Sequence, residues 1–178
     1  MKKALLVIDV LNDFCSPQGV LSKDVDGNLY AESAIPVILE RVREALANHW
    51  ELIFICDSHE ENDKEFDRFP PHCVQGTWGS ELVPSLADLL GNGEKGQFVL
   101  KNRYSGFYGT ELEELLQDVD EVHVVGVCTN ICVLYTVEEL CNRDLKVIVY
   151  RHGVASFDPE AHEWALKQME SVLGAEIR

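Results

Sequence analysis

Long hydrophobic runs are absent from this 178-residue sequence, as are internal repeats and low-complexity tracts. A membrane-spanning helix needs about 20 consecutive apolar residues, and no stretch approaches that length. The apolar residues 4–8 stop at Asp9 without the small-residue pattern of a signal-peptide cleavage site. We therefore interpret them as a buried strand, and we expect a cytoplasmic location and no membrane partner.

Basic residues are scarce: 15 Lys and Arg stand against 31 Asp and Glu, which gives a net charge of −16. So acidic a surface repels phosphate backbones and anionic lipids, and this argues against nucleic-acid binding. The acidic excess is spread along the chain, as is typical of a solvated surface. We expect a small molecule as the partner, and the sequence leaves open a homo-oligomer.

A Cys-x-x-Cys pair is also missing, although the chain has six cysteines. Their even number would suit disulfide bonds in a small secreted protein, but no secretory signal is evident. We expect free thiols at these six positions: Cys15, Cys56, Cys73, Cys128, Cys132 and Cys141.

What the sequence does contain fits one domain over residues 1–178, since 46% of the residues are hydrophobic and can form a full-sized core. Short apolar runs rich in β-branched residues lie at 4–8, 52–56, 122–127 and 147–150, with a weaker one at 98–100 and a final one at 176–178. Continuous rather than alternating runs indicate parallel strands buried on both faces.

Helical patterns separate these runs. They lie at residues 32–49, 81–90, 110–116, 131–141 and 158–174, the last opened by Asp158-Pro159 and closed by Gly174. Strand–helix alternation predicts a three-layer α/β/α sandwich with a mainly parallel, Rossmann-like sheet. The longest irregular segments are 12–30 and 58–79, and long loops in compact domains are often functional.

Reactive side chains follow four of the predicted strands. They are Asp9, Asp57 with His59, Lys101, and the segment 128–132. Because ligands bind at the carboxyl ends of parallel strands, we expect these residues at one edge of the sheet. Each has an ordinary structural explanation alone, but their convergence favours a catalytic site.

Cys132 is the predicted nucleophile, because it lies where a strand passes into a helix. Helix N–H groups and a nearby ammonium, for which Lys101 is the candidate, are expected to lower the thiol pKa. Asp9 is the candidate to take the thiol proton and return it to a leaving group. A lone buried cysteine is usually inert, so the prediction depends on all three residues meeting.

A second cluster is predicted in the loop after the Asp57 strand. Asp57, His59, Glu65 and His72 offer nitrogen and oxygen ligands that suit one divalent ion: zinc first, with manganese or iron as alternatives. The alternative is a polar, solvated loop without a metal.

Taken together, these segments resemble the isochorismatase-like cysteine hydrolases, and within them the nicotinamidases. The similarity is carried by residues 7–14 around Asp9, by residues 101–107 opening with Lys101, and by residues 126–133 around Cys132. It covers nearly the whole chain. The resemblance implies a catalytic triad of Asp9, Lys101 and Cys132.

The resemblance also implies a non-proline cis peptide between Val127 and Cys128, with the backbone N–H groups of Cys128 and Cys132 forming an oxyanion hole. It implies a metal that holds a pyridine nitrogen, and aromatic residues at Phe14, Phe69 and Tyr104 that flank the ring. This chain has Cys128 and Asn130 where family members often have alanine and aspartate. Neither change removes a member of the triad.

The function expected from this resemblance is hydrolysis of nicotinamide to nicotinate and ammonia through a Cys132 thioester, in NAD salvage. One alternative is hydrolysis of another small amide or an N-carbamoyl compound, and the metal loop argues against it. A non-catalytic binding protein on the same scaffold is a further alternative, and the intact triad argues against that.

Overall fold

The computed structural model describes residues 1–91 and 95–178, which form a six-stranded sheet with the strand order β3-β2-β1-β4-β5-β6. The five strand pairings described are all parallel. The strands are β1 (Lys3–Ile8), β2 (Glu51–Asp57), β3 (Gln97–Lys101), β4 (Glu121–Val127), β5 (Lys146–Ala155) and β6 (Glu176–Ile177). The predicted parallel α/β sandwich is confirmed.

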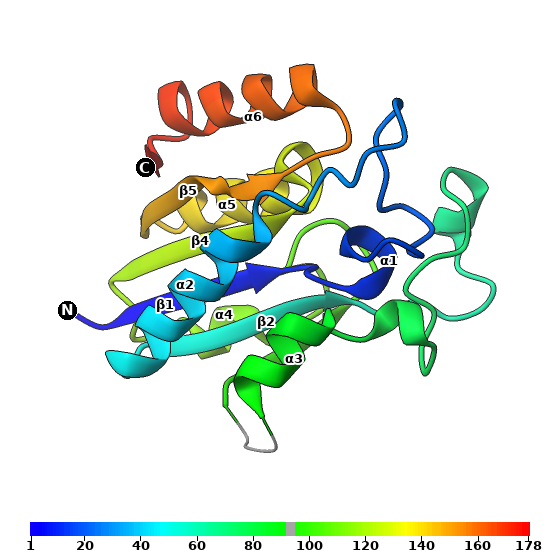
Figure 1. Cartoon of the computed structure of the whole chain (residues 1–178). Helices are drawn as coiled ribbons and strands as arrows, with labels where there is room; N and C mark the ends of the chain where they lie inside the picture. Colours follow the sequence, from blue (N-terminus) through cyan, green and yellow to red (C-terminus); the bar gives the residue numbers. More distant parts are fainter. Residues whose placement is uncertain (92–94) are drawn as a thin grey trace.

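Helices cover both faces of the sheet (Figure 1). One face packs against α1 (Asn12–Cys15), α2 (Ile35–Ala47) and α3 (Pro84–Leu90). The other packs against α4 (Leu112–Leu115), α5 (Leu134–Asn142) and α6 (Pro159–Ser171). No helix in the described part of the chain is long and apolar enough to cross a membrane.

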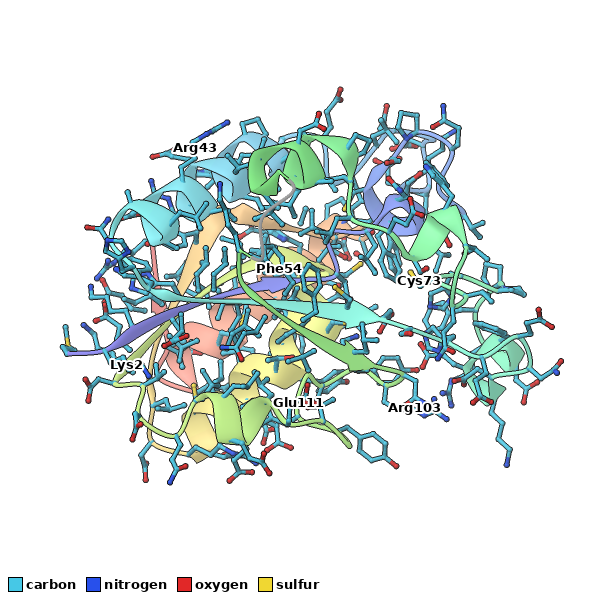
Figure 2. The ribbon with its side chains drawn as sticks, turned by 90° about the horizontal axis from the view of Figure 1, so that it is seen from below. Lys2, Arg43, Phe54, Cys73, Arg103 and Glu111 are labelled. Atoms are coloured by element: carbon cyan, nitrogen blue, oxygen red, sulfur yellow. The ribbon has the colours of Figure 1, made fainter. Side chains whose placement is uncertain are left out.

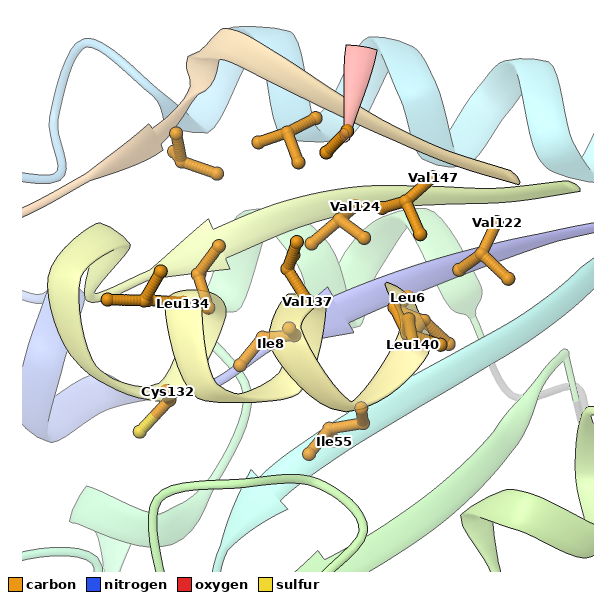
Figure 3. Close-up of a cluster of buried hydrophobic side chains, with 14 of the residues drawn as sticks. Leu6, Ile8, Ile55, Val122, Val124, Cys132, Leu134, Val137, Leu140 and Val147 are labelled. Carbon is orange, nitrogen blue, oxygen red and sulfur yellow. The ribbon is translucent and has the colours of Figure 1, made fainter. Parts of the chain in front are cut away.

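Strand β1 shows why continuous apolar runs form the centre of this sheet. Leu5 and Val7 join the core beneath α2, whereas Leu6 and Ile8 join the core beneath α5. Figure 3 shows Leu6 and Ile8 facing Val137 and Leu140 of α5. Burying each such side chain contributes about 1.5–3 kcal/mol, so both faces of the strand stabilise the fold.

Two strands differ from the sequence prediction. Phe98 and Leu100 of β3 are 50% and 61% exposed, because β3 lies at an edge of the described sheet and has one neighbouring strand. The prediction that this run is buried on both faces is therefore wrong. Strand β5 continues beyond Tyr150 to Ala155, so His152 lies within the strand rather than after it.

Helix boundaries differ as well. Helix α2 begins at Ile35 rather than near residue 32, with Pro36 in its first turn, where a missing N–H is tolerated. The helix predicted over 131–141 is two elements: a π-helical turn over Thr129–Val133 and then α5. The predicted loop 12–30 contains the short helix α1.

The carboxyl ends of the strands meet at the end of the molecule that holds α1 and segment 58–83 (Figure 1). Figure 2 places Cys73 and Arg103 at this end and Lys2 at the opposite end. The loops that follow β1, β2, β3 and β4 therefore converge, as the positions of the reactive residues predict.

Candidate active site

Asp9, Lys101 and Cys132 meet at the carboxyl ends of β1, β3 and β4. The Nζ of Lys101 lies 2.9 Å from Asp9 Oδ2 and 3.5 Å from Cys132 Sγ, and it also contacts the Asp57 carboxylate. The side chains of Asp9 and Lys101 are fully buried. Asp9 has a positive φ of 51°, and its Oδ1 accepts the Asp57 N–H at 2.8 Å. The sequence thus brings an acid, an amine and a thiol into one enclosed cluster.

Burial dominates the electrostatics of this cluster. It raises the pKa of Asp9 to about 6, with Asp57 adding to the rise and Lys101 opposing it. Burial disfavours the charge on Lys101, but the carboxylates of Asp57 and Asp9 outweigh it and keep its pKa well above the usual range. Asp9 is therefore a stronger base than an exposed aspartate, beside a permanent ammonium.

The prediction of a lowered thiol pKa is wrong for the free protein. Burial raises the pKa of Cys132 well above its usual range; Lys101 lowers it, whereas Asp9 and Asp57 raise it. Because a carboxylate oxygen of Asp9 and the sulfur of Cys132 lie within 4.8 Å of each other in a buried cluster, a neutral thiol next to a carboxylate is the favoured resting state. Reaction then requires proton transfer rather than a preformed thiolate.

The turn that carries Cys132 has the backbone that the resemblance implies, including a cis peptide bond between Val127 and Cys128. The Cys128 thiol donates to the Tyr30 hydroxyl at 3.5 Å. Behind the turn, Thr129 Oγ1 and His162 Nδ1 lie 2.8 Å apart, and the Ser156 hydroxyl donates to the Asn130 side-chain oxygen at 2.6 Å. Figure 3 shows Cys132 at the end of the apolar cluster beneath α5. The turn is held from both sides, and Asn130 makes a specific contact.

A second group of side chains adjoins this cluster. One potential ligand atom from each of Asp57, His59 and His72 lies within 4.8 Å of the others. The Nε2 atoms of His59 and His72 lie 3.7 and 3.9 Å from Asp57 Oδ2. Glu65 lies beside them, with Oε1 3.9 Å from His72 Nε2. All four side chains are buried.

These residues fit a divalent metal ion. His59 Nδ1 contacts Asp63 Oδ2 at 3.1 Å, and His72 Nδ1 contacts the Pro70 carbonyl at 2.8 Å, which leaves both Nε2 atoms facing Asp57. Within residues 1–91 and 95–178, His59 Nε2 and Glu65 Oε2 are buried without a hydrogen-bond partner. Buried polar atoms without partners are costly, and a metal among them would satisfy them.

One pocket joins the two clusters. Its walls include Cys132, Asp57, Glu65 and His72, together with all three predicted ring contacts: Phe14, Phe69 and Tyr104. Sequence reasoning missed the apolar lining residues Leu21, Val127, Ile131 and Phe157. It also missed Asp63. The signal available in the sequence was an aspartate two residues before Glu65, a residue type that often caps the start of a helical turn.

The fold and the site define an α/β/α sandwich protein with a candidate hydrolase site, and comparison with known proteins gives its family. Residues 3–177 match the isochorismatase domain, so the chain belongs to the isochorismatase family. Together with the relatives below, this makes it an amidohydrolase of that family.

The similar proteins cover essentially the whole chain. The isochorismatase family protein PncA of Bacillus subtilis is 37% identical over 99% of each chain. The crystal structure of nicotinamidase PncA from that organism superposes with a TM-score of 0.90 at 35% identity, again over 99% of each chain. Pyrazinamidase of Pyrococcus horikoshii in complex with zinc is 30% identical, with a TM-score of 0.87 over 100% of this chain and 99% of that one. N-carbamoylsarcosine amidase of Thermoplasma acidophilum is 27% identical, with a TM-score of 0.77 over 100% and 96%.

Proposed function

We propose that this protein is a nicotinamidase: it hydrolyses nicotinamide to nicotinate and ammonia through a Cys132 thioester, and serves NAD salvage in the cytoplasm. The observation that carries the proposal is the shared pocket. Cys132 and the metal-ligand candidates Asp57 and His72 line the same apolar cavity, in which a pyridine ring can contact both at once. The similar pyrazinamidase with zinc and nicotinamidase PncA support this assignment.

In the acylation half, Asp9 accepts the proton of the Cys132 thiol, and the sulfur attacks the carboxamide carbon. The oxygen of the resulting tetrahedral adduct takes up negative charge, and the backbone N–H groups of Cys128 and Cys132 stabilise it. As the adduct collapses, Asp9 returns the proton to the nitrogen, ammonia leaves, and a nicotinoyl thioester remains on Cys132. The Lys101 ammonium stabilises the sulfur anion from 3.5 Å.

In the deacylation half, Asp9 acts as base again. It takes a proton from water, the hydroxide oxygen attacks the thioester carbon, and the Cys132 sulfur leaves. The proton held by Asp9 then returns to the sulfur, which restores the neutral thiol. The pKa of Asp9 is raised to about 6, which is closer to neutral pH than the pKa of an exposed aspartate. Asp9 can therefore both accept and return a proton.

Asp57, His59 and His72 would hold the metal, with Glu65 as a fourth proposed ligand. The bound ion would act as a template that takes the pyridine nitrogen, and zinc fits the mixed nitrogen and oxygen ligand set, as manganese and iron do. Phe14, Phe69 and Tyr104 line the pocket, where they would flank the ring and exclude water from it. The carboxamide is then directed at Cys132.

The proposed substrate is tested by measuring ammonia release from four amides. Nicotinamide and pyrazinamide both carry a ring nitrogen and are expected to be hydrolysed, whereas an N-carbamoyl compound and benzamide are expected to be poor substrates. Benzamide is the sharpest control, because it has the ring and the carboxamide but no nitrogen for the metal. If benzamide were hydrolysed as fast as nicotinamide, the protein would instead be assigned as a general small-amide hydrolase.

Removal of the metal is expected to weaken substrate binding. Chelation, or the double variant His59→Ala/His72→Ala, should raise the nicotinamide KM at least about tenfold, which corresponds to ~1.4 kcal/mol of lost binding. Steady-state kinetics and metal analysis check this. His49→Ala/His152→Ala is the matched control, because both of these histidines are exposed. Metal-free protein with an unchanged KM would contradict the template role.

A family member acting on another small amide is the second candidate, and the similarity to N-carbamoylsarcosine amidase favours it. The buried His59 and His72 side chains argue for nicotinamide, since a linear amide has no ring nitrogen for a metal to hold. The same four-substrate assay decides between the two, because an N-carbamoyl amidase would release ammonia from its own substrate class without chelator sensitivity.

A further inference from the structure

Asp63 is a buried carboxylate outside the predicted site that contacts three of its segments. Its side chain is 5% exposed. Oδ2 lies 3.1 Å from His59 Nδ1, and Oδ1 accepts the Glu65 N–H at 2.8 Å. Arg103 Nη1 donates to both carboxylate oxygens at 3.0 and 3.1 Å. One side chain thus connects two candidate metal ligands to the segment that begins with Lys101.

The contact with His59 fixes which ring nitrogen is free. An ionised carboxylate can only accept hydrogen bonds, so His59 must donate to Asp63 from Nδ1. In the neutral imidazole the lone pair then lies on Nε2, the atom that faces Asp57 Oδ2 at 3.7 Å and has no hydrogen-bond partner among the described residues. This is the tautomer that a metal needs, and a carboxylate behind the ring also makes Nε2 a stronger ligand.

The other two contacts fix the position of the carboxylate itself. Asp63 caps the turn Lys64–Asp67, which sets where Glu65 lies relative to His72. Arg103, whose side chain is 33% exposed, neutralises the charge of Asp63 from the β3 side. Because Arg103 is two residues from Lys101 and adjacent to Tyr104, this pair ties the proposed metal loop to the wall of the pocket.

We infer that Asp63 is a positioning residue: it holds His59 in the metal-binding tautomer and Glu65 in place, and so sets the affinity for the metal and, through it, for the pyridine ring. The inference rests on the proposed metal site. It concerns a residue that touches neither the metal nor the substrate, so its loss should change metal affinity and KM rather than the chemical step at Cys132.

Two variants separate positioning from folding. Asp63→Asn can still accept the Glu65 N–H through its oxygen, but its amide nitrogen faces His59 and favours the tautomer with the proton on Nε2. Asp63→Ser keeps a good cap for the turn and removes the anchor of His59 altogether. Asp67→Asn is the control, since it makes the same charge change at an exposed position of the same turn.

The zinc dissociation constant of each protein is measured by competition with a chromophoric chelator. Both Asp63 variants should bind zinc about 10- to 100-fold more weakly than wild type, the usual effect of losing such a contact. At limiting zinc their nicotinamide KM should rise; at saturating zinc kcat should return close to the wild-type value. Nitrogen NMR of the metal-free proteins should show the His59 proton on Nδ1 in wild type and on Nε2 in Asp63→Asn.

Each result is decisive. Zinc affinity and His59 tautomer unchanged in both Asp63 variants would overturn the positioning role while leaving the metal site intact. A lower melting temperature of the metal-free variants with unchanged zinc affinity would show a purely structural residue and overturn it too. If the wild-type protein bound no zinc, or if its zinc binding did not require His59 and His72, the proposed metal site would be wrong, and this inference would fail with it.

Discussion

Cys132→Ala is expected to abolish ammonia release from nicotinamide, whereas Cys128→Ala should retain most of it. Loss of the nucleophile from a hydrolase lowers kcat on the order of 10⁶-fold. Cys128 and Cys132 both line the pocket, but it is Cys132 Sγ that lies 3.5 Å from Lys101 Nζ. The Cys128 thiol instead contacts the Tyr30 hydroxyl, and its loss should cost less than about tenfold, or ~1.4 kcal/mol on the barrier.

The two cysteine variants are matched, because both residues are buried and lie in the same turn. Ammonia release gives the rates, and intact-protein mass spectrometry of the acid-quenched enzyme detects a nicotinoyl group on wild type and on Cys128→Ala but not on Cys132→Ala. If Cys128→Ala were inactive and Cys132→Ala active, the assignment of Cys132 as the nucleophile would be wrong. Zinc content and circular dichroism show that each variant is folded and loaded.

The fold was predictable because the central strands are apolar on both faces. The run 4–8 has no polar residue, and the run 122–127 has one, His123, so burial on both faces follows in a parallel sheet covered by helices. Phe98 and Leu100 look the same in sequence, yet they are exposed. Whether a strand lies at an edge depends on the order of strands in the sheet, which the residues of that strand do not encode.

The convergence of Asp9, Asp57, Lys101 and Cys132 was predictable for a related reason. Each ends a strand or follows one, and parallel strands bring their carboxyl ends to one edge. Their ionisation was not predictable. The sequence shows an amine and a helix near Cys132, and both lower a thiol pKa, but the burial that outweighs them comes from packing between distant segments.

Asp63 shows the same limit for the candidate metal site. His59 and His72 stand out as potential ligands in any sequence, whereas Asp63 is one acidic residue among several between 60 and 67. Its selection depends on the turn Lys64–Asp67, which directs its carboxylate toward His59 and leaves Asp67 exposed. Residues that position ligands are found from the partners of the ligands, and those appear only in the folded chain.

Asp9→Asn is expected to lower kcat with nicotinamide by a factor of about 10²–10⁴, the contribution that a positioned general base makes. Asparagine can still accept the Asp57 N–H, which bonds Asp9 Oδ1 at 2.8 Å, so the backbone contact between β1 and β2 survives. What is lost is the proton acceptor for the Cys132 thiol. Because burial keeps that thiol protonated, too little Cys132 thiolate is present to compensate for the missing base.

The variant also removes the negative charge 2.9 Å from Lys101 Nζ, which leaves Asp57 as the neighbouring carboxylate. Asp118→Asn is the matched control, since Asp118 is exposed and precedes β4, whereas the site lies at the other end of that strand. Single-turnover kinetics with nicotinamide should show slow thioester formation, and hydrolysis of the isolated thioester should be slow as well, because Asp9 acts as base in both halves. Rapid thioester formation with only hydrolysis impaired would restrict Asp9 to activating water and would require another base for Cys132. A kcat within twofold of wild type, at full metal content, would remove Asp9 from the mechanism.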